Sequence, residues 1–83
     1  MARYYFHIRD HVDRLLDPDG VEVLDPATLP AIALREARAL VAAEALDGVI
    51  NLAQYIEVED ADGKAVHQLG FSDAVKFINS LPN

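Results

Sequence analysis

The sequence predicts an α+β domain, a mostly antiparallel four-stranded sheet with one long helix packed on one face. Residues 3–9 alternate apolar and polar side chains with the period of a half-buried strand. An alanine-rich stretch, residues 31–47, repeats its apolar side chains at helical spacing. Two short alternating runs flank Asp62-Gly63, a pair typical of hairpin turns. The 83 residues are expected to form a single domain, residues 1–83.

The first strand divides its side chains between the two faces of the sheet. The set expected to face the core is Tyr4, Phe6 and Ile8. The set expected to face away is Arg3, Tyr5, His7 and Arg9. Residues 10–13 read as a turn and residues 14–16 as a short strand. Asp17-Pro18-Asp19-Gly20 is a strong turn signal, since proline presets φ and glycine accepts positive φ. Residues 21–24 then form the second main strand, which is expected to pair with the first.

The long helix is expected to start at Thr28, with Asp25-Pro26 as its lead-in, and to stop at Gly48. Its core-facing stripe is Ala33, Leu34, Ala37, Leu40 and Val41. Glu44 falls within that stripe. Either the last turn overhangs the sheet edge or Glu44 has a partner, and the pattern favours overhang because apolar stripes fail first at helix ends.

Residues 54–60 and 65–69 are the third and fourth strands. A two-residue turn at Asp62-Gly63 would set His67 opposite Val58 and Leu69 opposite Ile56. Ser72 can cap a final helix over residues 73–80 that buries Phe77 or Ile78. The predicted order is β-β-α-β-β-α.

A single long helix covers only one face of such a sheet. The other face must be solvated, covered by the C-terminal helix, or buried against a second copy. Because 52% of the residues are hydrophobic, which is high for so small a monomer, a homodimer is expected. The candidate interaction surface is Tyr5, His7, Arg9, Tyr55, Glu57 and Glu59.

Several segments together carry a family resemblance. The chain opens with Arg3-Tyr4-Tyr5-Phe6-His7-Ile8-Arg9-Asp10, and Asp19-Gly20-Val21-Glu22-Val23-Leu24-Asp25 precedes the helix. Phe71-Ser72-Asp73-Ala74-Val75 follows the last strand. This pattern resembles an uncharacterised family of small alphaproteobacterial proteins, a domain of unknown function that opens with an Arg-Tyr-[Phe/Tyr]-Phe-His strand. The chain departs from it at Ala2, where proline is usual, and at His11, where glycine is usual. The resemblance implies a single-domain fold and no assigned activity, cofactor or catalytic residue.

Charge and composition exclude several classes of function. A net charge of −7 argues against direct nucleic-acid binding, which needs a Lys/Arg patch. No apolar run approaches the ~20 residues of a membrane helix, so no membrane contact is expected. The first residues show no export signal, and a cytoplasmic location is expected.

The sequence contains possible metal and calcium ligands, but their spacing does not form either kind of site. His7, Asp10, His11 and Asp13 are plausible ligands, but a strand followed by a turn does not gather them on one face. His67 could join His7 across the sheet, although separate histidines are favoured. A calcium loop with Gly20 as its glycine would put Leu15 and Pro26 at ligand positions, which neither can fill. No metal or cofactor is predicted.

The sequence therefore predicts a small, acidic, non-enzymatic protein-interaction module that self-associates. One alternative is an acidic inhibitor, a nucleic-acid mimic that binds a basic surface of a partner protein. A small metal-dependent enzyme is a more distant alternative.

Overall fold

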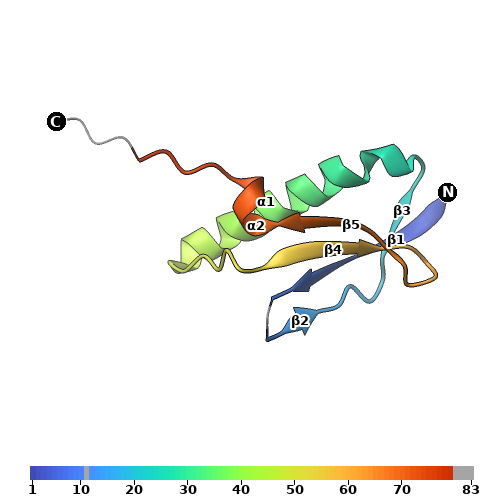
Figure 1. The fold of residues 1–83 in the computed structure, drawn as a ribbon, viewed down its shortest axis with the longest axis horizontal. Coiled ribbons are helices and arrows are strands. Elements are labelled where there is room, and N and C mark those ends of the chain that lie inside the picture. The colour runs from blue at the N-terminus through green and yellow to red at the C-terminus, as the bar shows by residue number, and fades with distance from the viewer. Residues whose placement is uncertain (11, 80–83) are drawn as a thin grey trace.

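The computed structural model describes residues 1–10 and 12–79. Its elements in chain order are β1 (Ala2–Arg9), β2 (Arg14–Leu15), β3 (Val21–Val23), the 3-10 turn η1 (Pro26–Thr28), α1 (Leu29–Asp47), β4 (Tyr55–Glu59), β5 (Ala65–Gly70) and α2 (Phe71–Ala74). Figure 1 shows α1 running along one side of the strands. The predicted α+β class, with one long helix on an antiparallel sheet, is confirmed.

The sheet is antiparallel throughout, in the order β2-β1-β4-β5, and β3 also pairs with β1. β2 pairs with the end of β1, at Ile8↔Leu15, and β3 pairs with its start, at Tyr4↔Val21. The predicted pairing of the two N-terminal strands is therefore confirmed. The short strand expected over residues 14–16 is β2, Arg14–Leu15, and it joins the sheet as a fifth strand.

The core lies between α1 and the two central strands. One residue per helical turn is buried, in the set Leu29, Ala33, Ala37 and Val41. They belong to the same buried cluster as Ile56 and Val58 of β4, both 0% exposed. Because alanine ends at Cβ, the helix backbone can approach the sheet closely. Tyr4, Phe6 and Ile8 also pack on this cluster, which confirms the predicted division of β1 between two faces.

Both ends of α1 follow local sequence signals. The Asp25 carboxylate accepts the Ala27 N–H at 3.0 Å, and the Thr28 hydroxyl donates to the Asp25 carbonyl at 2.7 Å. This hydrogen-bonded turn leads directly into α1, which begins at Leu29. At the other end Gly48 adopts φ +89°, and its N–H donates to the Ala45 carbonyl at 3.1 Å. The predicted limits at Thr28 and Gly48 are confirmed.

Glu44 has partners, which is the alternative that the sequence pattern did not favour. The helix residues after it, 45–47, are exposed. Glu44 Oε1 accepts the Asn51 N–H at 3.0 Å, and its Oε2 accepts from Gln54 Nε2 at 2.8 Å. The segment between α1 and β4 folds back under the last helical turn and brings these donors to the carboxylate. Helical periodicity carries no information about where a following loop returns, so the stripe alone could not show it.

In the β4–β5 hairpin, the strand pairs away from the turn have the predicted register, but the turn itself differs from the predicted one. Val58 pairs with His67, as expected, but Glu59 pairs with Ala65 through a bulge. The Asp60 N–H donates to the Lys64 carbonyl at 2.9 Å, which makes the loop longer than two residues. The Asp60 carboxylate accepts the N–H groups of Asp62 and Lys64, and this bonding selects the longer turn.

The predicted C-terminal helix over residues 73–80 is wrong. α2 covers only Phe71–Ala74, Val75 is extended, and Phe77 and Ile78 are 64% and 79% exposed. Phe71 and Ala74 take the buried places, and Arg38 Nε donates to the Ala74 carbonyl at 2.8 Å. α2 contacts α1 and β5, so it does not cover the opposite face of the sheet. Ser80 lies outside the described residues.

Candidate interaction surface

The six predicted surface residues lie together on the face of the sheet opposite α1, here called the open face. They form three adjacent cross-strand pairs between β1 and β4, namely Tyr5↔Glu59, His7↔Glu57 and Arg9↔Tyr55. Their neighbours Ile56 and Val58 point into the core, and side chains alternate along a strand, so these six point outward. The sequence pattern therefore places these six residues correctly on one face of the sheet.

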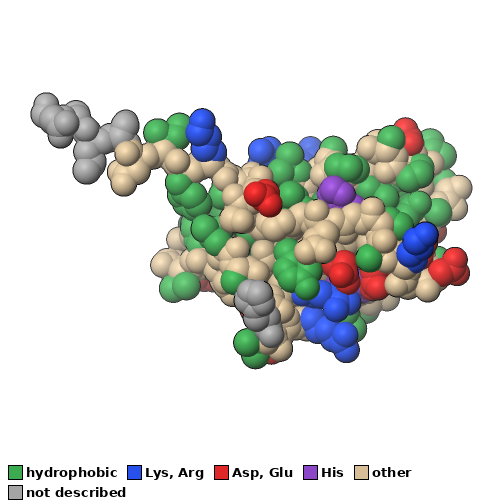
Figure 2. Space-filling model, in the orientation of Figure 1, with side chains coloured by type: hydrophobic (Ala, Val, Ile, Leu, Met, Phe, Trp, Pro, Cys, Tyr) green, Lys and Arg blue, Asp and Glu red, His purple; other side chains and the backbone are tan. Residues whose placement is uncertain are grey.

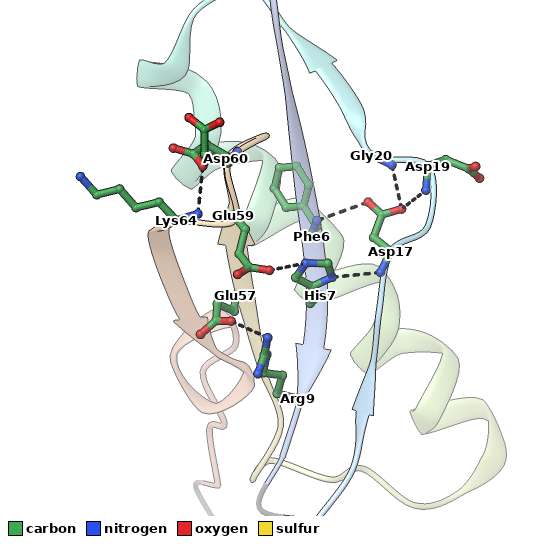
Figure 3. Close-up of polar contacts among 11 residues, drawn as sticks. Phe6, His7, Arg9, Asp17, Asp19, Gly20, Glu57, Glu59, Asp60 and Lys64 are labelled. Atoms are coloured by element: carbon green, nitrogen blue, oxygen red, sulfur yellow. Dashed lines mark hydrogen bonds and ion pairs between the residues drawn. The ribbon is translucent and has the colours of Figure 1, made fainter.

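Two diagonal contacts join β1 to β4 on the open face, a hydrogen bond from His7 to Glu59 and an ion pair between Arg9 and Glu57. His7 Nε2 lies 2.6 Å from Glu59 Oε1, and Arg9 Nη2 lies 2.9 Å from Glu57 Oε1 (Figure 3). These side chains are only 9–24% exposed. A third pair, Arg3 to Glu22 at 2.8 Å, is more exposed. Figure 2 accordingly shows basic and acidic side chains beside each other, with no broad area of one sign in that view.

His7 is buried although it lies on the open face, with only 7% of its surface exposed. Its Nδ1 accepts the Asp17 N–H at 3.0 Å (Figure 3), so the ring proton sits on Nε2 and points to Glu59. The Tyr5 ring stacks beside it, with centroids 6.2 Å apart and planes 12° from parallel. Three neighbours thus fix the imidazole, which serves as a structural link between β1, β4 and the β2–β3 segment.

Asp17 closes the gap between β2 and β3. Its carboxylate accepts the N–H groups of Phe6 at 3.3 Å, Asp19 at 3.2 Å and Gly20 at 3.1 Å. Partial burial by itself would raise the pKa of Asp17. The three hydrogen bonds and the nearby His7 outweigh burial and hold the pKa of Asp17 below its ordinary value of 3.8.

Arg9 is less completely satisfied than its neighbours. Its Nε is buried and has no hydrogen-bond partner among the described residues. A hollow of about 250 Å³ adjoins it, lined by Ile8, Arg9, Asp10, Asp13, Arg14, Leu15, Leu40 and Gln54. This volume is below the roughly 300–1,000 Å³ of most small-molecule pockets.

The histidines do not converge on one site. His7 is on the open face, whereas His67 pairs with Val58 and therefore lies on the side of α1. His11 lies outside the described residues. Within residues 1–10 and 12–79, no three His, Cys, Asp or Glu side chains are grouped to hold a metal ion.

In the acidic turns, Asp carboxylates accept hydrogen bonds from backbone N–H groups of the same turn. Asp10 Oδ1 accepts the N–H groups of Val12 and Asp13, and Asp17 and Asp60 do the same within their turns. The sequence predicts the turn at residues 17–20. The signal for a capping role was present in the Asp-Pro-Asp-Gly spacing. The bonds from Asp17 to β1 had no local signal.

The fold and the open face define a small α+β domain whose open-face polar side chains bond to one another across β1 and β4. A family model described as a domain of unknown function, DUF6894, matches residues 3–72, and the chain belongs to this family. The resemblance to a family of unknown function is confirmed at that level. Comparisons with curated proteins and with solved structures gave no match. In the described part of the chain, no helix combines the length and apolarity needed to span a bilayer.

Proposed function

We propose that this domain is a non-catalytic protein-interaction module that self-associates as a homodimer. One observation carries the proposal: among the described residues, twelve large apolar side chains are at least 36% exposed, against nine apolar residues in the core. The exposed set is Met1, Val12, Leu15, Leu16, Val21, Leu24, Leu46, Val49, Leu52, Val66, Phe77 and Ile78. Covering such side chains on association removes apolar surface from water, which favours a contact between copies.

The open face is the less favourable place for that contact. Its Arg9–Glu57 ion pair and His7–Glu59 hydrogen bond are already formed within one chain, and breaking them on association would leave partly buried polar groups unpaired. The acidic-mimic alternative has little support for a similar reason. Asp10, Asp17 and Asp60 each bind backbone N–H groups of their own turns instead of forming a free row of carboxylates.

Light scattering over a concentration series tests the proposal. The expected result is a mass that rises to twice the chain mass of 9.1 kDa. Added salt should strengthen the dimer, because each copy carries −7 and screening weakens their repulsion. A mass of 9.1 kDa up to ~1 mM, at low and high salt, would remove the proposal.

A variant of the open face separates the two surfaces. Tyr55→Lys adds a charge to the open face and leaves the twelve exposed apolar side chains unchanged. It is expected to leave the dimer intact. A dimer lost in Tyr55→Lys would place the contact on the open face instead.

A further inference from the structure

We infer that the contact between copies is an exchange of C-terminal strands, in which residues 75–79 of each chain add to the free edge of β5 in the other. This inference rests on the proposed self-association and names its mode. Strand addition needs an unpaired sheet edge and an unpaired extended segment. Each chain has both.

β5 is the more exposed of the two sheet edges. It is six residues long, ends the strand order and pairs only with β4 among the described strands. The opposite edge is divided into the two residues of β2 and the three of β3, with Asp17 filling the gap. Natural edges are protected by shortness, by bulges or by charged side chains. The β5 segment, Ala65-Val-His-Gln-Leu-Gly70, has no charged side chain, and its bulge is confined to its first residues.

The segment after α2 has the character of an unpaired strand. Val75 has φ −133° and ψ 155°, which is extended backbone. Valine, phenylalanine and isoleucine favour strands, and Phe77 and Ile78 are 64% and 79% exposed. Figure 1 shows the segment leaving the body of the domain at α2, and in Figure 2 its apolar and basic side chains stand clear of the body.

The residues just before this segment favour pairing with β5 of a second copy over pairing with β5 of the same chain. Phe71 and Ala74 are buried at about 1% exposure, and Arg38 Nε holds the Ala74 carbonyl at 2.8 Å. These contacts direct residues 75–79 past the end of β5. In Figure 1 the segment continues away from the strands and does not turn back along β5. A second copy related by a two-fold axis can receive the segment in this position.

Charge agrees with this pairing. Two copies at −7 each repel, so a contact must keep acidic residues apart. β5 has no charged side chain, and residues 75–79 carry only Lys76. Their pairing places no carboxylate against another.

Charged substitutions in the full chain give the first test. Phe77→Asp is expected to raise the dimer dissociation constant about 10- to 100-fold, the effect of losing one buried phenylalanine. Leu46→Asp, at a position 90% exposed on α1, is the matched control and should leave it unchanged. Both side chains are exposed in the monomer, so both variants should keep the wild-type circular dichroism.

Disulfide capture gives the second test, since the chain has no cysteine. A chain carrying Ile78→Cys is mixed with a differently tagged chain carrying Val66→Cys or Gln68→Cys, and the mixture is oxidised. The expected product is a disulfide between the two tags, which requires Cα atoms within about 7 Å. A partner carrying Leu24→Cys, 80% exposed beside β3, is the control.

The outcomes separate the two proposals. A wild-type monomer at all concentrations removes the self-association on which the inference rests. A wild-type dimer that Phe77→Asp leaves unchanged, or that Leu46→Asp disrupts equally, overturns strand exchange and leaves self-association standing. Disulfides confined to pairs of Ile78→Cys chains, or equally frequent with Leu24→Cys, also overturn it.

Discussion

The backbone N–H of Asp17 donates to His7 Nδ1 at 3.0 Å and ties the β2–β3 segment to the middle of β1. The Asp17 carboxylate meanwhile accepts the N–H of Phe6, the residue before His7. One residue thus supplies both a donor and an acceptor on the edge of β1 that faces away from β4, between the pairings with β2 and β3. This bonding keeps β2 and β3 on the same edge of β1.

Replacing the Asp17 side chain should destabilise the domain. Asp17→Ala leaves three backbone N–H groups without their acceptor, and we expect the free energy of unfolding to fall by about 1–3 kcal/mol. Urea denaturation measures the change. Asp19→Ala removes an exposed carboxylate from the same turn and is expected to change stability by less than about 0.5 kcal/mol. Equal losses in the two variants would contradict the assigned role.

The lowered pKa of Asp17 predicts an acid-sensitive contribution to stability. A carboxyl whose pKa is lower in the folded state stabilises the fold above its ordinary pKa of 3.8, and that stabilisation is lost as pH falls through the folded value. Between about pH 5 and pH 2 the wild type should lose more stability than Asp17→Asn, which keeps an acceptor oxygen but does not titrate. The measurement is the unfolding free energy of both proteins across this range. Parallel curves would rule out Asp17 as the source.

Two glycines with positive φ should respond differently to a methyl group. Gly20 has φ +71°, and a Cβ there would lie 2.9 Å from the Tyr4 carbonyl oxygen. Gly63 has φ +83° and nothing within 4 Å of the same position. Gly63→Ala should therefore cost only the left-handed strain, about 1–2 kcal/mol, whereas Gly20→Ala should add a steric cost of about 1–3 kcal/mol. Thermal unfolding compares them, and a Gly63→Ala loss as large as that of Gly20→Ala would refute the predicted clash.

Glu44 should stabilise the connection between α1 and β4. In Glu44→Ala the Asn51 N–H loses its acceptor, and we expect a loss of about 1 kcal/mol together with faster hydrogen exchange at Asn51. Asp47→Ala, one turn nearer the negative end of the helix, is expected to be neutral or stabilising by about 0.3–1 kcal/mol. An unchanged rate of hydrogen exchange at Asn51 in Glu44→Ala would show that the connection between α1 and β4 is stable without Glu44.

Much of the fold was predictable because its signals are local. The alternation of Tyr4 to Arg9 assigned each β1 side chain to the correct face, and Gly48 marked the end of α1. The hairpin register at Val58 and His67 followed from the Asp62-Gly63 turn, although the Asp60 carboxylate changed the turn itself. The final helix was mispredicted because Phe71 and Ala74 occupied the remaining core positions, which local capping signals do not reveal.

The sequence by itself determined the main strands, the long helix, the two faces of the sheet and the set of six side chains on the open face. These depend on periodicity and turn chemistry, which act over a few residues. Only the tertiary structure decided how those side chains are bonded: the diagonal pairs to Glu57 and Glu59, the Asp17 link to His7, the partners of Glu44 and the free position of Phe77. Each of these contacts depends on how segments distant in the chain are placed relative to one another, or on which side chain fills a given position in the core. No local sequence pattern encodes that placement.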